Sequence, residues 1–199
     1  MLSPLTRRSV LATCAAAGLA GCGGRPSAPS ASVAPQPDSA GASSKRRRRV
    51  AATPVHLAIP TIGVDTRLVR LGLREDGTVE VPSVRGTAGW FRLGTVPGQR
   101  GSAVILGHVD SVDGPDVFAD LSALRSPDRV QVALSDDGLV TFEVIGIETY
   151  ANADFPADRV YAGSRRTRAL NLVTCGGDYD PERGGYPANV VVYTRRARA

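Results

Sequence analysis

The sequence predicts a mainly β fold, a barrel or a sandwich of about eight strands, over residues 53–199. Short runs rich in β-branched residues recur along this region, and turn-forming pairs such as Asp76-Gly77 and Asp137-Gly138 separate them. With roughly 147 residues, the region is also long enough to bury a hydrophobic core. The expected strands are 55–59, 66–71, 78–81, 103–106, 129–134, 140–149, 169–174 and 190–194.

A short helix is predicted among these strands, at residues 116–124. Val117, Phe118, Leu121 and Leu124 fall on one face when this segment is wound as a helix. We therefore expect one or two short helices beside the strands. No apolar stretch of the region is long enough to span a membrane, which takes about 20 residues.

The start of the chain predicts export. Arg7 and Arg8 precede a short apolar run at 10–19, which is typical of a signal peptide and too short for a spanning helix. The run ends in Leu-Ala-Gly before Cys22, and this ending resembles the lipobox of bacterial lipoproteins. The resemblance implies a signal peptide at 1–21 and a lipidated Cys22 as the first mature residue. The alternative is an ordinary signal peptide with Cys22 incidental, and the paired arginines also resemble a twin-arginine signal.

Residues 22–52 are predicted to form a disordered tether. Pro, Ser, Ala and Gly dominate this stretch, which shows no apolar periodicity and cannot bury enough surface to offset its ordering entropy. It contains a basic run at 45–49. This run could rest on anionic lipid or on a cell-wall polyanion, or it could be a solvated linker that repels itself and stays extended.

Positive charge is concentrated at the start of the chain. The whole sequence has a formal net charge of +5. Residues 1–52 contain eight basic residues against one aspartate, a net charge of +7, which leaves −2 for residues 53–199. The basic character belongs to the leader and tether, so the folded region gives no reason to expect nucleic acid as a partner.

Cysteine usage leaves one thiol in the folded region. Cys14 lies inside the predicted signal peptide and Cys22 is the predicted lipid site, so Cys175 alone remains. Exported domains usually avoid cysteine or pair it in disulfides. An unpaired Cys175 is therefore either a reactive thiol or a buried inert one.

Two strand ends carry groups suited to nucleophilic catalysis. The apolar strand at 103–106 ends at a glycine and delivers His108 to a loop, and the strand at 169–174 presents Cys175 ahead of two glycines. Glycines after a nucleophile give a substrate carbonyl room and leave backbone N–H groups free to meet an oxyanion. A histidine can serve as proton-transfer partner. His56 lies within the first predicted strand, and we expect a structural role for it.

At these residues the chain resembles the sortase family. The order of the motifs carries the resemblance, and together they span most of residues 54–194. The motifs are the His108 segment, Leu-Val-Thr-Cys at 172–175, Ile-Pro-Thr-Ile-Gly-Val-Asp at 59–65, Val-Pro at 81–82 and Ala-Gly-Trp-Phe at 88–91. The extension Cys-Gly-Gly-Asp-Tyr-Asp at 175–180, with Tyr186 and Asn-Val-Val-Val-Tyr at 189–193, is most similar to class F sortases of high-GC Gram-positive bacteria.

The resemblance implies a sortase-type eight-stranded β-barrel and a catalytic set of cysteine, histidine and arginine. Cys175 would form a thioester with a threonine-like residue of a sorting signal, and His108 would transfer protons. Thr174 would either shape the substrate groove or simply pack within its strand. No cofactor is expected, and no metal-binding constellation stands out in the sequence.

The arginine departs from the family's familiar pattern. The usual position, at the start of the following strand, holds Asn189. Arg183 lies in the preceding loop, which stays close to Cys175 if the two strands pair antiparallel. Arg195 would lie roughly 17 Å further along the strand, and Arg168 is displaced by a similar distance along the cysteine's own strand. We therefore assign oxyanion or substrate positioning to Arg183. The alternative is a solvated loop arginine paired with Glu182 or Asp180.

The resemblance also implies partners and a location. The partners would be secreted proteins with a sorting signal similar to LPXTG, a peptidoglycan precursor or other amine acceptor, and the membrane through a lipid anchor on its extracytoplasmic face. One rival function is an L,D-transpeptidase, disfavoured because no Ser-His-Gly precedes Cys175. The other is a non-catalytic sortase-like lipoprotein that binds wall or partner proteins. We interpret Asp110, Asp113 and Asp116 as solvated carboxylates of one acidic loop. The alternative is that this loop binds calcium.

Overall fold

A computed structural model describes residues 52–182 and 184–198. The predicted signal peptide, Cys22, the tether up to residue 51 and Arg183 lie outside these described residues. The strands of the described part are β1 (Pro54–Ile59), β2 (Val64–Leu71), β3 (Ala88–Phe91), β4 (Gly101–Leu106), β5 (Asp110–Ser111), β6 (Gly114–Pro115), β7 (Arg129–Leu134), β8 (Leu139–Ala151), β9 (Arg168–Gly176) and β10 (Ala188–Arg196).

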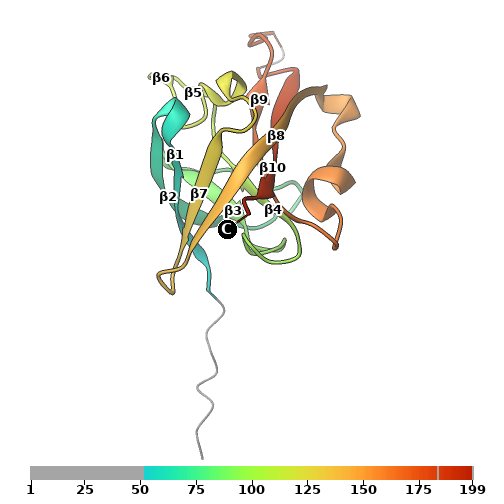
Figure 1. Ribbon diagram of the computed structural model, residues 1–199. Coiled ribbons are helices and arrows are strands. Elements are labelled where there is room, and N and C mark those ends of the chain that lie inside the picture. The colour runs from blue at the N-terminus through green and yellow to red at the C-terminus, as the bar shows by residue number, and fades with distance from the viewer. Residues whose placement is uncertain (1–51, 183, 199) are drawn as a thin grey trace, which may run out of the picture. The chain divides into compact units, whose positions relative to one another are not determined.

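Eight of these strands close into a barrel, in the order β1-β2-β3-β4-β9-β10-β8-β7 (Figure 1). Most neighbours are antiparallel, but β2 pairs with β3 and β4 pairs with β9 in parallel. The two remaining strands, β5 and β6, form a small hairpin. The predicted mainly β fold with an eight-stranded barrel is therefore confirmed.

Seven of the eight predicted strands match barrel strands, and the prediction at 78–81 was wrong. Val79 forms only an isolated bridge with Leu73. The eighth barrel strand is β3, which the strand prediction missed. A Cβ on Gly89 of β3 would lie 2.4 Å from Leu71 Cδ1, so the close approach of β2 and β3 requires glycine there. Glycine is depleted in strands, so residue propensities did not predict a strand at the position where this pairing requires glycine.

Helical structure in the described residues is limited to single turns. These are the 3₁₀ turns η1 (Pro60–Ile62), η2 (Leu121–Ala123) and η3 (Asn152–Asp154), and the π turn η4 (Asp158–Ala162). The helix predicted at 116–124 is reduced to η2. The amides of Asp116 and Phe118 donate to the carbonyls of Val109 and His108, so they tie this segment to the histidine loop. The apolar pattern correctly identified buried residues, since Phe118, Leu121 and Leu124 are fully buried.

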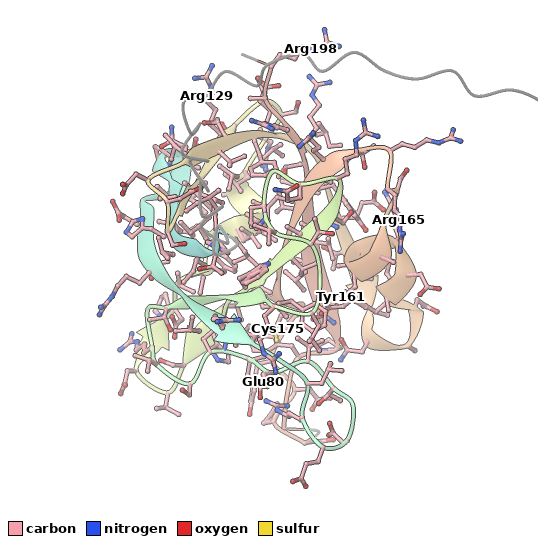
Figure 2. The ribbon with its side chains drawn as sticks, turned by 90° about the horizontal axis from the view of Figure 1, so that it is seen from below. Glu80, Arg129, Tyr161, Arg165, Cys175 and Arg198 are labelled. Atoms are coloured by element: carbon pink, nitrogen blue, oxygen red, sulfur yellow. The ribbon has the colours of Figure 1, made fainter. Side chains whose placement is uncertain are left out.

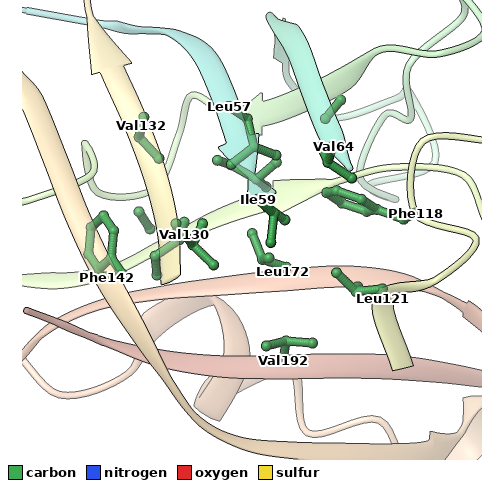
Figure 3. Packing of buried hydrophobic residues seen from close by; sticks show 14 of the residues in the cluster. Leu57, Ile59, Val64, Phe118, Leu121, Val130, Val132, Phe142, Leu172 and Val192 are labelled. Carbon is green, nitrogen blue, oxygen red and sulfur yellow. The ribbon is translucent and has the colours of Figure 1, made fainter. Parts of the chain in front are cut away.

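The core fills the barrel, and a second apolar cluster covers part of its outside. Leu57, Ile59, Phe142, Leu172 and Val192 are among the side chains that meet inside (Figure 3). Outside, η4 packs over the middle of β4, β9 and β10, in a cluster of Val104, Val160, Val173, Val191 and Tyr193. These three strands are thus buried on both faces along much of their length. Within the described part of the chain, no helix has the length and apolarity needed to cross a membrane.

Candidate active site

Neighbouring parallel strands deliver the two predicted catalytic side chains to one end of the barrel. β4 and β9 pair in register up to Leu106 and Val173. The Gly107 amide then donates to the Val173 carbonyl, with an N–O distance of 3.2 Å. His108 and Cys175 each lie two residues beyond the last pair. Because paired strands run about 4.8 Å apart, the same register places His108, just after β4, and Cys175, near the end of β9, at the same end of the strand pair.

Cys175, labelled in Figure 2, is half-buried on the outer face of the barrel. Side chains alternate along β9, so Cys175 shares its face with Val173 of the outer cluster, whereas Thr174 shares the inner face with Leu172. Thr174 is 4% exposed, and its buried hydroxyl finds no hydrogen-bond partner among the described residues. Thr174 therefore lies on the opposite face of β9 from Cys175, and its role in shaping the substrate groove stays a prediction.

The backbone holds the imidazole of His108 by one nitrogen. Nε2 lies 2.8 Å from the carbonyl oxygen of Pro82. Because a carbonyl oxygen can only accept, Nε2 carries the proton in this hydrogen bond, and Nδ1 of the neutral ring is left able to accept one. The hydrogen bond to Pro82 therefore fixes the tautomer of a neutral, half-buried ring and leaves Nδ1 as its acceptor nitrogen.

Asp110 and Tyr186 link the two loops around the site. Asp110 begins β5, two residues after His108, and Tyr186 lies just before β10. The Tyr186 hydroxyl donates a hydrogen bond to Oδ2 of Asp110. Figure 1 shows β5, β6 and the loop between β9 and β10 at one end of the barrel. The hydrogen bond raises the pKa of Tyr186 to about 12, so the phenol stays protonated at neutral pH.

The surroundings of Cys175 favour the neutral thiol. Burial raises the pKa of Cys175 above its usual value, and the negative charge of Asp110 raises it further. A thiolate, which is the nucleophilic form, therefore needs positive charge or a proton acceptor beside Cys175.

The backbone requires both glycines that follow Cys175. A Cβ on Gly176 would lie 2.7 Å from Val190 Cγ2. Gly177 has a φ of +84°, which side chains rarely tolerate. The backbone directly after Cys175 consequently carries no side chains, as a carbonyl approaching the sulfur would need.

Of the four polar residues weighed for the arginine role, three have described positions. Asn189 pairs directly with Cys175, and its amide donates to Asn152 Oδ1 at 2.8 Å. Arg195 pairs with Ala169 at the far end of β9, and Arg168 is the first residue of that strand. Neither of these arginines reaches Cys175. The role assigned to Arg183, which lies outside the described residues, stays a prediction.

The remaining histidine and the loop carboxylates have other partners. His56 lies on β1, with Nε2 2.9 Å from a carboxylate oxygen of Asp65. Asp113 forms an ion pair with Arg85 at 3.6 Å, and Asp116 accepts hydrogen bonds from two backbone amides. Among residues 52–182 and 184–198, no group of three or more His, Cys, Asp or Glu could hold a metal ion.

Sequence reasoning missed two parts of the site. The Pro82 carbonyl that orients His108 is a backbone group and carries no sequence signal. The Asp110–Tyr186 hydrogen bond joins residues 76 positions apart. The spacing of Asp110 from His108 was a usable hint, because a carboxylate two residues from a strand-end histidine stays near the same loop.

Comparisons with known proteins bear on the family and the fold of the chain. A family model of the sortase domain matches residues 57–197. No curated protein matches the sequence. Sortase C1 from Streptococcus agalactiae is 20% identical, with a TM-score of 0.57 over 73% of this chain and 67% of that chain. Sortase A from Corynebacterium diphtheriae is 17% identical, with a TM-score of 0.56 over 76% of this chain and 64% of that chain. The sortase D5 transpeptidase from Clostridium perfringens is 19% identical, with a TM-score of 0.54 over 73% and 79%.

Proposed function

The chain belongs to the sortase family of cysteine transpeptidases, and we propose that it is a class F-like member with Cys175 as nucleophile and His108 as proton-transfer residue. Sortases in general cleave proteins that carry a sorting signal and pass the acyl group to an amine acceptor. We propose a C-terminal signal similar to LPXTG as the substrate of this chain. The observation that carries the proposal is the common register of β4 and β9, whose last pair, Leu106 and Val173, is followed two residues later by His108 and Cys175.

The first half-reaction forms a thioester. The Cys175 sulfur attacks the carbonyl carbon of the threonine-like residue, and the thiol proton passes to Nδ1 of His108, since Nε2 already donates to the Pro82 carbonyl. The C–N bond of the substrate then breaks. The proton moves from His108 to the departing amine, which leaves the acyl group on sulfur and a neutral imidazole.

The second half-reaction passes the acyl group to the acceptor. The nitrogen of an incoming amine attacks the thioester carbonyl and loses a proton to Nδ1 of His108. The C–S bond breaks, and the histidine returns the proton to the Cys175 sulfur. A new amide bond is made, and the enzyme is regenerated without any external oxidant or reductant.

Positive charge at the oxyanion is assigned to Arg183. The burial of Cys175 and the proximity of Asp110 both oppose a thiolate, so a cation near the sulfur is needed during attack. Asn189 supplies none, and the strand pairings set Arg168 and Arg195 far from Cys175. The loop that contains position 183 joins the end of β9 to the start of β10, and its flanks Asp180 and Gly185 pair with each other.

Attachment to the envelope is the second part of the proposal. Sortases are generally extracytoplasmic, and the lipobox-like ending at Cys22 supports a lipid anchor for this one. The Cys22→Ala variant should be released or left unprocessed when the full chain is expressed in a Gram-positive host. A variant that is still processed and stays in the membrane fraction would contradict the lipid anchor but not the catalytic assignment.

The test of the catalytic function is peptide transfer. The purified chain would be incubated with a library of sorting-signal peptides and a small amine, and the cleaved and transferred peptides would be identified by mass spectrometry. We expect transfer of a threonine-containing subset and a covalent thioester on Cys175. Thiol labelling separates this from a non-catalytic binding protein, because labelling of an active sortase depends on His108.

A further inference from the structure

Six arginines line one cavity of about 680 Å³ at the end of β9 opposite Cys175. They come from the residue before β4, from η4, from the loop before β9, from the first residue of β9 and from the end of β10: Arg100, Arg159, Arg166, Arg168, Arg195 and Arg196. Ala169, which also lines this arginine cavity, is about 20 Å along the strand from Cys175. Figure 2 shows the neighbouring Arg165 and Arg198 well away from Cys175.

The positive charge of the arginine cavity is only partly balanced. Arg159 pairs with Glu148 at 2.7 Å, and Arg195 pairs with Glu143 at 3.4 Å. The other four arginines form no ion pair with any residue of the described ranges. The described lining contains no aspartate or glutamate. Because residues 53–199 sum to −2, this concentration of positive charge is a local feature and not a result of composition.

The walls of the arginine cavity are held in place by specific contacts. Arg159 donates two hydrogen bonds to Glu148, and its Cζ lies 4.2 Å from the centroid of the Tyr193 ring. These bonds lower the pKa of Glu148 and raise that of Arg159, so the pair stays charged at neutral pH. Gly163 has a φ of +52°, and a Cβ there would lie 1.9 Å from the hydroxyl of Ser102, which is buried beneath it. The loop over the cavity can therefore pack against its floor only with glycine at this position.

We propose that the arginine cavity binds an organic phosphate. Guanidinium groups recognise phosphate oxygens by paired, charge-assisted hydrogen bonds. Four of them here have no carboxylate partner among the described residues, and of these four Arg168 also donates to the Gly98 carbonyl. The volume exceeds that of a single phosphate and falls in the range of small-molecule sites. Ile145, Ala169 and the Tyr193 ring provide apolar walls for the organic part. The phosphate can belong to a soluble molecule or to a phospholipid headgroup, and one experiment distinguishes the two.

The experiment uses the full chain and two matched variants. Arg166→Gln/Arg196→Gln removes two charges from the cavity, and Arg67→Gln/Arg74→Gln removes two exposed charges elsewhere. Binding of glycerol 3-phosphate is measured by titration calorimetry. Binding to vesicles of phosphatidylglycerol, with phosphatidylcholine as the neutral control, is measured by co-sedimentation. The predicted basic run at 45–49 is present in all three proteins, so its contribution to vesicle binding cancels in the comparison.

We expect the cavity variant to bind about tenfold or more weakly, since hydrogen bonds to charged groups are lost, whereas the control variant binds as the unaltered chain does. Binding of glycerol 3-phosphate identifies a soluble ligand, and binding of phosphatidylglycerol vesicles alone identifies a headgroup. The proposal is overturned if neither probe binds, or if both variants lose affinity equally. Peptide transfer by the cavity variant should be unchanged, which separates this site from the catalytic function.

Discussion

The two ends of β9 have opposite electrostatic environments. At one end Cys175 is half-buried beside the carboxylate of Asp110, and at the other end Arg168 lies among five further arginines of one cavity. About 20 Å of strand separates them, which is twice the screening length of roughly 8–10 Å at physiological salt. The arginine cavity therefore cannot stabilise a Cys175 thiolate. The comparison shows that arginines on a barrel can stabilise a thiolate only where the strand register places them close to it.

Replacing Cys175, the proposed nucleophile, should have the largest effect, and only at its own end of β9. Cys175→Ala should abolish cleavage and transfer, because no thioester can form without the sulfur. Glycerol 3-phosphate binding by the same variant should be unchanged in calorimetry. Residual transfer would remove Cys175 from the mechanism, and a loss of phosphate binding would show that the two ends are coupled.

Removing the imidazole should cost slightly less. His108→Ala should slow transfer by about 10² to 10⁴-fold, the usual contribution of general acid–base catalysis. Steady-state rates with a transferable peptide would measure this loss. His56→Ala is the matched control, since His56 pairs with Asp65 on the first two strands and should leave the rate nearly unchanged.

The arginine substitutions compare the two ends of β9 directly. Arg183→Ala should slow transfer by about 10² to 10³-fold if it supplies an oxyanion donor. Arg195→Ala, which breaks a pair with Glu143 at the opposite end, should have little effect on transfer. The reverse result would show that the loop before β10 does not supply the catalytic cation, and the role would pass to Arg195.

Neutralising Asp110 should favour the thiolate of Cys175 over the neutral thiol. Asp110→Asn removes a negative charge that raises the pKa of Cys175, so the thiolate becomes easier to form and the pKa should fall. The pH profile of thiol labelling should shift to lower pH. Asp136→Asn, in the turn between β7 and β8, removes the same charge elsewhere and should leave the profile in place. An unmoved profile in Asp110→Asn would mean that burial alone sets the pKa.

The smallest effect is expected at Thr174, on the opposite face of β9 from Cys175. Thr174→Val should raise the free energy of unfolding by about 1 kcal/mol, because the buried hydroxyl has no hydrogen-bond partner among the described residues. Denaturant unfolding would measure this gain. Transfer activity should stay close to that of the unaltered chain, and a marked loss would instead support the predicted role of Thr174 in the substrate groove.

Local patterns in the sequence predicted most of the barrel and the two strand ends of the site. β7 matches the predicted range 129–134, His108 follows β4 as expected, and Cys175 lies in β9, which runs two residues beyond the predicted strand. What the sequence could not predict depends on closure of the barrel. The Asp110–Tyr186 hydrogen bond joins distant loops, and the arginine cavity gathers residues from five separate segments. In the sequence these residues look like ordinary surface charges, because no period or spacing relates them.

The parallel pairing of β4 with β9 also determines when activity appears as the chain folds. Leu106 and Arg168, at the ends of these strands, are separated by roughly 60 residues, whereas β7 and β8 are joined by a short turn. Closing a long loop costs more chain entropy, and pairings distant in sequence form slowly. The β7–β8 hairpin can form early, while His108 and Cys175 come together only once β4 has paired with β9. We therefore expect catalytic competence to appear late as the chain folds.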